Sequence, residues 1–324
     1  MKAIVQDRYG VLEFGTADVP VAGDGEVLVE VRACSVNAWD WHVMRGDPYL
    51  ARLTMGIRRP KRRIRGRDFA GTVTAVGRNV TRFRPGDEVY GDLGRLEGAF
   101  AEYVAVPEGQ ADRKPVNLTF EEAAAVPLAA NTALMGLRDV AKVEPGQRVL
   151  INGASGGVGT FAVQLAKSFG TTVTAVCSTR NVEMVRNLGA DHVVDYTQQD
   201  FTRAGERYDV VFDLVGNHSL RSLRRVLTPS GLLMIAGGGV SRGGSLLGPI
   251  GLVIRAKLLA PFTGRRVVVH SERPSSTNLA ALRELIESGQ VTPVIDRTYP
   301  LSETVSAIDY VEIEHARAKV VISV

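Results

Sequence analysis

Residues 147–180 read QRVLINGASGGVGTFAVQLAKSFGTTVTAVCSTR, and this stretch decides the fold. The apolar run Val149–Ile151 is typical of a strand buried on both faces of a sheet. A glycine-rich turn follows at 154–159, and from Phe161 onward apolar residues recur at helical spacing. Thr171–Val176 has the pattern of a second strand, so the stretch predicts a strand–helix–strand unit of a parallel sheet.

The turn predicts a binding site for a dinucleotide. A helix that begins directly after glycines presents unpaired N–H groups and the positive end of its dipole, which suits a pyrophosphate. An ordinary turn is the alternative, because a glycine-rich turn alone is weak evidence of binding. The flanking strand and helix favour cofactor binding by Ala154, Ser155, Gly156, Gly157, Val158 and Gly159.

The loop after the second strand indicates which dinucleotide binds. Folds that prefer NAD place an Asp or Glu about 20 residues after the glycines, where it binds the ribose 2′-hydroxyl. Here that place holds Cys177, Ser178, Thr179 and Arg180, with no acid. Because a guanidinium pairs with phosphate through its planar fork, we predict NADPH, with Ser178, Thr179 and Arg180 at the 2′-phosphate. A solvated Arg180 is the alternative.

Length and composition fit a globular protein of two domains. The chain has 324 residues, of which 45% are hydrophobic and 23% charged. Cys34 and Cys177 form no disulfide or metal-binding pattern, which predicts a reducing, cytoplasmic location. We see no signal peptide at the N-terminus. The longest apolar run, Leu246–Phe262, is interrupted by Arg255 and Lys257 and is too short to span a membrane.

The basic character of the chain is confined to one segment. Residues 52–67 hold eight Arg or Lys and no acid, so removing them changes the formal charge of +4 to 4 − 8 = −4. Such a segment suits nucleic acid, an anionic surface or an acidic ligand. We favour a solvated loop beside an active site, because no aromatic residues interleave the charges as a base-stacking platform requires.

The first part of the chain, to about residue 120, alternates short strand patterns with turns. Examples are Glu26–Val31, Gly71–Val76 and Asp87–Tyr90, and the spacing predicts a small all-β barrel. Glu121–Leu137 is rich in Ala and Leu and predicts a helix, with Thr119 as its N-cap.

Further strand–helix units follow the glycine turn and predict a doubly wound parallel sheet, which makes the fold class α/β. Asp191–Asp195, Tyr208–Val215 and Gly231–Ala236 are the expected strands, and Arg265–Ser271 and Lys319–Val324 are later candidates. Ligands of such sheets bind at the carboxyl ends of the strands. We therefore add the residues at two strand ends to the cofactor site, with ordinary turns as the alternative: Val215, Gly216, Gly237 and Gly238.

Over essentially its whole length the chain resembles the medium-chain dehydrogenase/reductase superfamily, and within it the zinc-free quinone oxidoreductase branch that includes zeta-crystallin. The matching motifs are VNAWD (36–40), GRDFAGTV (66–73), Val76-Gly77, FRPGDEV (83–89), AFAEY (99–103), Gly153–Gly159 and LGAD (188–191). The resemblance implies a GroES-like domain (1–122), a Rossmann NADP-binding domain (123–267) and a C-terminal segment (268–324) that returns to the first domain. It also implies a cleft between the domains, and a homodimer joined through 265–271; that strand closing only its own sheet is the alternative.

Departures from the zinc-dependent members concern the metal ligands. Those members carry a Cys where this chain has Asn37, and a Gly-His-Glu motif where it has Gly66-Arg67-Asp68. A catalytic zinc needs about three N, S or O ligands. Asn is a poor ligand and Arg is none, so we expect no zinc and interpret Cys34, three residues away, as buried filler.

Without a Lewis acid, the expected function is an NADPH-dependent, zinc-independent oxidoreductase. It would transfer hydride to a quinone or an α,β-unsaturated carbonyl, with the protein supplying position and electrostatics. One alternative is a zinc-free alcohol or aldehyde oxidoreductase. Another is a non-catalytic NADPH-binding protein whose basic segment binds RNA or an anionic surface, although nucleic acid is not the favoured partner.

The resemblance also implies roles for single residues. Asn37 would position cofactor and substrate. His42 replaces a Tyr that contacts substrate in related reductases, and it would donate to the oxyanion; a structural hydrogen bond, for example to Asp40, is the alternative. Tyr49 is a second candidate donor, with a core or rim Tyr as the alternative.

Two further residues match cofactor positions of the family. Thr132 matches a position near the cofactor. Tyr196 matches a residue near the adenosine 2′-phosphate, and simple packing is the alternative for it.

Overall fold

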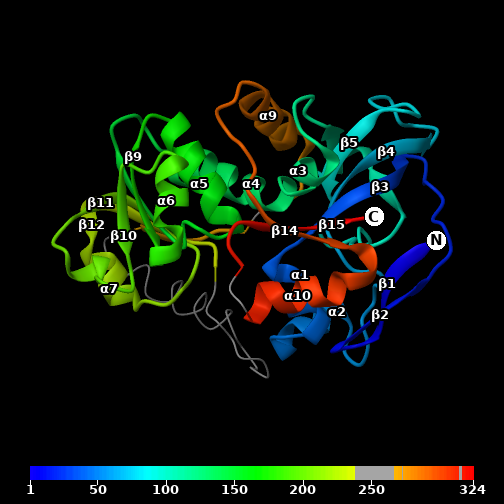
Figure 1. Cartoon of the computed structure of the whole chain (residues 1–324), viewed down its shortest axis with the longest axis horizontal. Coiled ribbons are helices and arrows are strands. Elements are labelled where there is room, and N and C mark those ends of the chain that lie inside the picture. Colours follow the sequence, from blue (N-terminus) through cyan, green and yellow to red (C-terminus); the bar gives the residue numbers. More distant parts are fainter. Residues whose placement is uncertain (238–265, 272, 314–315) are drawn as a thin grey trace. The chain divides into compact units, whose positions relative to one another are not determined.

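The computed structural model describes residues 1–237, 266–271, 273–313 and 316–324. It divides into two compact units, of which unit 1 is Met1–Asn131 with Arg273–Val324 and unit 2 is Thr132–Glu272. Both chain ends therefore belong to unit 1 (Figure 1). The expected boundary between 122 and 123 would cut helix α3 (Phe120–Ala124), which lies wholly in unit 1.

Unit 2 contains the predicted parallel sheet. Its described strands are ordered β10-β9-β8-β11-β12-β13, and every neighbouring pair is parallel. The bounds are β8 Arg148–Asn152, β9 Thr172–Cys177, β10 His192–Asp195, β11 Tyr208–Asp213, β12 Leu227–Ile235 and β13 Arg266–Val269. The chain runs outward from β8 to β10 and then crosses back to β11, so the switch point of the sheet lies between β8 and β11.

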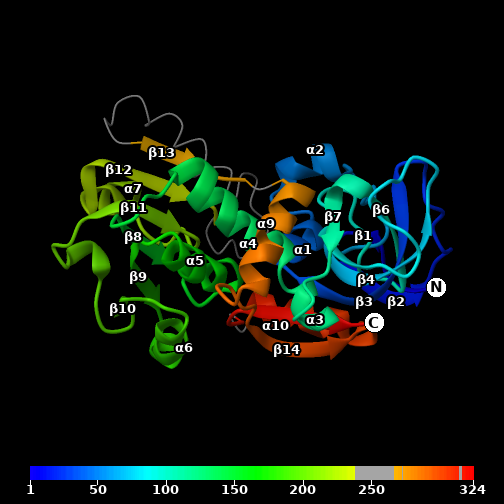
Figure 2. The same cartoon turned by 90° about the horizontal axis from the view of Figure 1, so that it is seen from above.

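Helices connect these strands (Figure 2). Their bounds are η3 Met135–Ala141, α5 Gly157–Ser168, η4 Thr179–Asn181, α6 Val182–Asn187, η5 Phe201–Arg203 and α7 Leu220–Arg225. Helix α5 packs on β8 and β9 and buries Phe161 and Leu165. The prediction of one continuous helix over 121–137 was wrong. This segment of the chain forms three pieces, α3, α4 (Pro127–Leu134) and η3, because Pro127 has no N–H and starts a new helix. Thr119 does cap α3, because it accepts from Glu122 N.

Unit 1 contains a largely antiparallel sheet in the order β14-β15-β3-β4-β5-β7, with β6 also paired to β3 and a separate hairpin of β1 and β2. The strands are β1 Lys2–Arg8, β2 Val11–Thr16, β3 Glu26–Val36, β4 Asp68–Val76, β5 Glu88–Asp92, β6 Tyr103–Pro107, β7 Ala111–Arg113, β14 Ile295–Pro300 and β15 Lys319–Ser323. The helices are α1 Ala38–Arg45, η1 Tyr49–Ala51, α2 Arg52–Met55, η2 Glu108–Gln110, α3, α9 Ser276–Glu287, η7 Leu301–Glu303 and α10 Thr304–Ile313.

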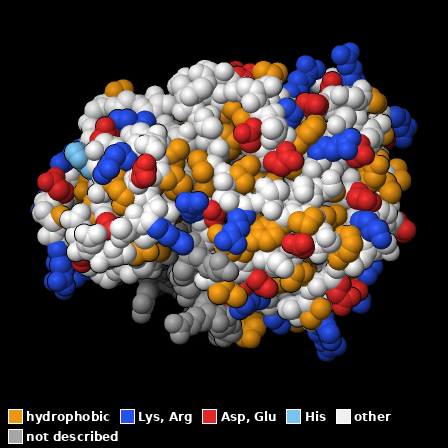
Figure 3. Space-filling model, viewed as in Figure 1, with side chains coloured by type: hydrophobic (Ala, Val, Ile, Leu, Met, Phe, Trp, Pro, Cys, Tyr) orange, Lys and Arg blue, Asp and Glu red, His pale blue; other side chains and the backbone are white. Residues whose placement is uncertain are grey.

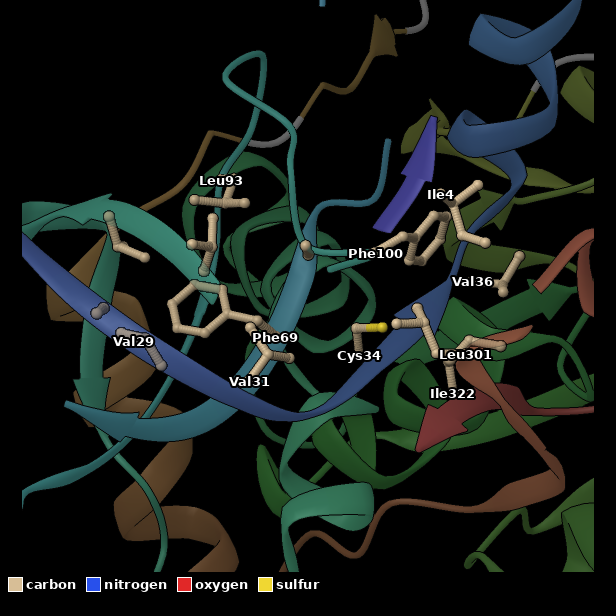
Figure 4. Packing of buried hydrophobic residues seen from close by; sticks show 14 of the residues in the cluster. Ile4, Val29, Val31, Cys34, Val36, Phe69, Leu93, Phe100, Leu301 and Ile322 are labelled. Carbon is tan, nitrogen blue, oxygen red and sulfur yellow. The ribbon is translucent and has the colours of Figure 1, made fainter. Parts of the chain in front are cut away.

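The last strand of the chain is central to unit 1. β15 pairs antiparallel with β3, and Val320 lies opposite Val36. The first half of β3 alternates in burial, whereas its second half is buried on both faces. In the core, Cys34, Phe69, Phe100 and Ile322 lie among other fully buried side chains (Figure 4), so Cys34 is a packed core residue as predicted. This pairing brings the first residue of β15, Lys319, beside the residue that follows β3, Asn37.

Some sequence predictions fall outside the described residues. These are Gly238, Arg265 and the segment 240–262. Among the helices that the structure describes, none is long and apolar enough to cross a membrane.

Candidate functional site

The glycine turn of unit 2 links β8 to α5. Gly153 has φ +88°, a conformation that favours glycine, and Gly156 is the N-cap of α5. A Cβ on Gly159 would lie 2.1 Å from the Gly153 carbonyl oxygen. Only glycine allows the first turn of the helix to approach the strand end this closely, so the turn holds the N–H groups at the start of α5 at the edge of the sheet.

The residues around the turn fit a dinucleotide. A Cβ on Gly156 would meet only the Gly153 oxygen, at 3.5 Å, so the space in front of the helix start is open. The Asn181 amide donates to Ser155 Oγ at 3.1 Å and to Ser178 Oγ at 3.2 Å, which ties the turn to the loop after β9. Asn181 Oδ1 is buried without a hydrogen-bond partner in the described structure. Sequence reasoning missed Asn181.

Asp213, at the end of β11, organises the switch point and was also missed. Its Oδ1 accepts from the Asn152 side chain at 2.9 Å and from the backbone N–H groups of Val215 and Gly216 at 3.2 and 3.0 Å. A Cβ on Gly237 would lie 2.0 Å from the Leu214 oxygen, so the ends of β11 and β12 approach closely. The structure therefore brings Val215, Gly216 and Gly237 to the same edge of the sheet as the glycine turn.

A carboxylate lies beside the loop after β9, where the sequence showed no acid. It is Asp195, at the end of the neighbouring strand β10, opposite Cys177. The Thr179 hydroxyl donates to it at 2.5 Å, and this bond and those from Thr197 and Gln198 lower the pKa of Asp195. The Thr179 hydroxyl is thus engaged by an anion, which counts against its predicted contact with a phosphate. Tyr196, the next residue, is 57% exposed.

In unit 1, Asn37 lies at the centre of a buried polar network. Lys319 Nζ donates to Asn37 Oδ1 at 2.5 Å and to the Val36 carbonyl at 3.2 Å. Asn37 Nδ2 donates to Asp68 Oδ2 at 2.9 Å. Both ends of the amide are therefore held by protein charges. The Asn37 side chain also takes part in the capping box of α1, so one amide hydrogen is left over for a ligand.

The charges of this network are almost completely buried. Asp68 is 0% exposed and Lys319 2%, and Nζ lies 3.4 Å from Asp68 Oδ2. Asp68 also accepts from Ser35 Oγ at 2.9 Å and from Leu128 N at 3.0 Å. Burial raises the pKa of Asp68 and lowers that of Lys319, and each charge opposes the shift of the other. The two groups thus form an ion pair whose separation would leave a charge in a nonpolar interior.

The second position that matches a zinc ligand holds Arg67, which is also committed to the protein. Its guanidinium forms two hydrogen bonds with Asp92, at 2.9 and 2.6 Å, and both side chains are buried. Asn37 and Arg67 therefore present hydrogen bonds where the related enzymes present metal ligands. The part of the chain that the structure describes contains no group of three or more His, Cys, Asp or Glu that could hold a metal ion.

Asp40 is a buried carboxyl next to this network. Its Oδ2 accepts from the Asn37 backbone N–H at 2.7 Å at the start of α1, which is its observed partner in place of His42. Burial raises the pKa of Asp40 from 3.8 to about 7.

The raised pKa gives a prediction for stability. The folded state holds the Asp40 proton more tightly than the unfolded state, so this group lowers the unfolding free energy as pH rises from about 4 to about 7. In Asp40→Asn the amide oxygen keeps the hydrogen bond but does not titrate. We expect urea unfolding to show that the variant lacks this fall, which is worth up to roughly 4 kcal/mol over the window. If the unfolding free energies of the wild type and Asp40→Asn fell equally as pH rises, Asp40 would not be the group responsible.

The other predicted site residues lie in separate surroundings. His42 is stacked on Trp41, burial lowers its pKa, and its Nδ1 has no partner in the described structure. Tyr49 is 45% exposed and its ring lies 4.7 Å from the Arg52 guanidinium, as expected of a rim residue. In unit 2, the Thr132 carbonyl accepts from His270 Nε2 at 3.0 Å.

Comparison with known proteins shows which families and relatives this chain is similar to. Residues 23–116 match the alcohol dehydrogenase GroES-like domain, and residues 188–322 match a family described as zinc-binding dehydrogenase. The chain is 35% identical to the mitochondrial NAD(P)H oxidoreductase RTN4IP1 of Mus musculus, covering 100% of this chain and 89% of that protein. It is 34% identical to the chloroplastic NADPH-dependent alkenal/one oxidoreductase of Arabidopsis thaliana, covering 99% and 79%.

A solved structure shows the same fold over the whole chain. The quinone oxidoreductase from Coxiella burnetii superposes with a TM-score of 0.87 at 31% identity, covering 100% of this chain and 99% of that one.

Proposed function

Because the chain belongs to the medium-chain dehydrogenase/reductase superfamily, in its quinone oxidoreductase branch, we propose that it is an NADPH-dependent reductase of quinones or α,β-unsaturated carbonyls. The observation that carries the proposal is the network of Asn37, Lys319 and Asp68, which fills a metal-ligand position with an amide held between two charges. A site built in this way favours acceptors that need little polarisation, which quinones and enones are. Zinc independence is part of the proposal.

Residues of unit 2 would hold the cofactor, which supplies a hydride when bound. The N–H groups at the start of α5 would bind the pyrophosphate, and Ser178 and Arg180 would contact the 2′-phosphate. Two observations support NADPH over NADH. No acid follows β9 directly, and a relative at 34% identity is named as NADPH-dependent. We assign Thr132, Tyr196, Val215, Gly216 and Gly237 to the same site.

In unit 1 we assign Asn37 to positioning the acceptor, since its free amide hydrogen is directed by Lys319 and Asp68. His42 is the candidate for donating to the developing oxyanion. Burial lowers the pKa of His42 and favours the neutral ring, which carries one N–H, whereas a hydrogen bond with the Asp47 backbone opposes this shift. The alternative donor, Tyr49, already stacks on Arg52.

A deuterium label distinguishes the proposed reaction from carbonyl reduction. The enzyme would be given NADPH deuterated at the transferred position and an enone, and the product would be examined by NMR. We expect deuterium on the β-carbon of a saturated ketone. Deuterium on the carbinol carbon of an allylic alcohol would show an alcohol or aldehyde oxidoreductase instead, and NADPH binding without turnover would favour a non-catalytic protein.

Arg180 gives a prediction about cofactor choice. We expect Arg180→Ala to weaken NADPH binding about tenfold or more in fluorescence titrations, because a charge-assisted bond to the 2′-phosphate is lost. NADH binding should change little. Arg225→Ala on α7, also exposed, is the control. Equal weakening of both cofactors would contradict the assignment.

The edge position of β13 bears on the assembly of the protein. We propose a homodimer, because β13 is the last strand in the order of the described sheet. A cytoplasmic location and the absence of nucleic-acid binding remain predictions from the sequence.

A further inference from the structure

The basic segment 52–67 is not uniformly solvated, which corrects the sequence interpretation. Arg65 and Arg67 are buried and form ion pairs with Glu97 and Asp92. Arg63 pairs with Asp7 on the surface. Arg52 donates to the carbonyls of Gly46 and Arg45 at 2.8 and 2.9 Å. The exposed cations that remain are Arg58, Arg59, Lys61 and Arg62.

Aliphatic side chains are exposed beside these four cations. Leu50, Leu53 and Ile57 are 41%, 64% and 68% exposed. We call residues 50–62 the basic–aliphatic loop. It contains no acid, whereas Lys, Arg, Asp and Glu are interspersed over the face shown in Figure 3.

The basic–aliphatic loop is fixed by contacts within itself and with Tyr9, in the turn between β1 and β2. The Arg52 guanidinium lies 4.3 Å from the centroid of the Tyr9 ring and 4.7 Å from that of the Tyr49 ring. Tyr9 donates to the Gly56 carbonyl at 2.6 Å, and Lys61 N donates to the Met55 carbonyl at 2.8 Å. The exposed side chains are therefore presented from an ordered backbone, which lowers the entropy lost on binding a partner.

We propose that the basic–aliphatic loop binds the surface of an anionic lipid bilayer. Four cations near such a surface each contribute about 1 kcal/mol, and apolar side chains that enter the interface add to this. Charge alone would also suit RNA. However, RNA-binding surfaces stack bases on aromatic rings, and here the exposed apolar side chains that precede the cations are Leu and Ile, while the Tyr49 ring is paired with Arg52. The proposal is independent of the proposed catalysis.

Sedimentation with vesicles tests the proposal. The whole protein would be mixed with vesicles of phosphatidylcholine and phosphatidylserine, or of phosphatidylcholine alone, at low and at physiological salt. We expect binding to the mixed vesicles only, weakened by salt. A variant with Arg58, Arg59, Lys61 and Arg62 all replaced by Gln should bind a hundredfold or more weaker. The control replaces four exposed arginines elsewhere, Arg78, Arg84, Arg186 and Arg203, and should bind nearly as the wild type does.

A second variant separates lipid from other polyanions. We expect Leu53→Gln with Ile57→Gln to bind mixed vesicles roughly tenfold weaker, because the side chains no longer enter the interface. Circular dichroism melting would confirm that each variant folds. Absence of vesicle binding at low salt would overturn the proposal. The proposal would also be overturned if the variant with Leu53→Gln and Ile57→Gln bound vesicles as strongly as the wild type does. It would likewise be overturned if the wild type bound RNA more tightly than vesicles and this variant bound RNA equally well.

Discussion

Lys319→Met is expected to lower the unfolding free energy by about 3–5 kcal/mol at pH 8, because Asp68 would remain buried without its counter-charge. Asp68 would then hold its proton more tightly in the folded state than in the unfolded one. The deficit should accordingly grow as pH rises above about 4 and be smaller at pH 5 than at pH 8. Urea unfolding at the two pH values measures both effects.

Two further variants make this result specific. Lys319→Met with Asp68→Asn removes both charges, and we expect it to recover most of the lost stability. Lys167→Met breaks an ion pair with Asp191 in which both side chains are about one-third exposed. We therefore expect it to lower the unfolding free energy by less than about 1 kcal/mol. A double variant as unstable as Lys319→Met, or a loss as large in Lys167→Met, would show that the buried charge is not the cause.

At two glycines of the turn, the same added methyl group should have different effects on stability. In Gly159→Ala the methyl would lie 2.1 Å from a backbone oxygen, so the start of α5 must shift. We expect a loss of about 1–3 kcal/mol in stability and of NADPH binding with it. In Gly156→Ala the nearest atom is 3.5 Å away, so the fold should be kept within about 1 kcal/mol.

Gly156→Ala therefore tests the ligand rather than the fold. We expect NADPH binding to weaken about tenfold or more, since the methyl group enters the space through which a pyrophosphate approaches the helix. Fluorescence titration and thermal melting of the two variants provide the comparison. NADPH binding by Gly156→Ala at wild-type strength would place the pyrophosphate elsewhere.

Local sequence patterns predicted the parallel sheet because the residues that determine each strand or helix are close neighbours in the sequence. Val149–Ile151 falls inside β8, and Thr119 caps α3 through Glu122 N. The same reasoning missed Asp195 as a neighbour of Thr179, because the acid arrives from the adjacent strand rather than from the loop after β9.

The polar network was missed for a similar physical reason. Lys319 and Asp68 are 251 residues apart, and only the pairing of β15 with β3 brings them together. A Lys at the start of an otherwise apolar final strand was the available indication. In the basic segment, Arg65 and Arg67 looked solvated because their partners, Glu97 and Asp92, lie 32 and 25 residues further along the chain.

Reduction without a metal can be tested directly in one assay. The protein would be treated with a strong chelator, and the chelator would then be removed. The treated protein would be mixed with NADPH and a quinone, and the loss of NADPH absorbance would be followed with and without added Zn²⁺. We expect the same rate in both samples, because the metal-ligand positions hold Asn37 and Arg67 in hydrogen bonds with the protein. Activity lost on chelation and restored by Zn²⁺ would contradict the account.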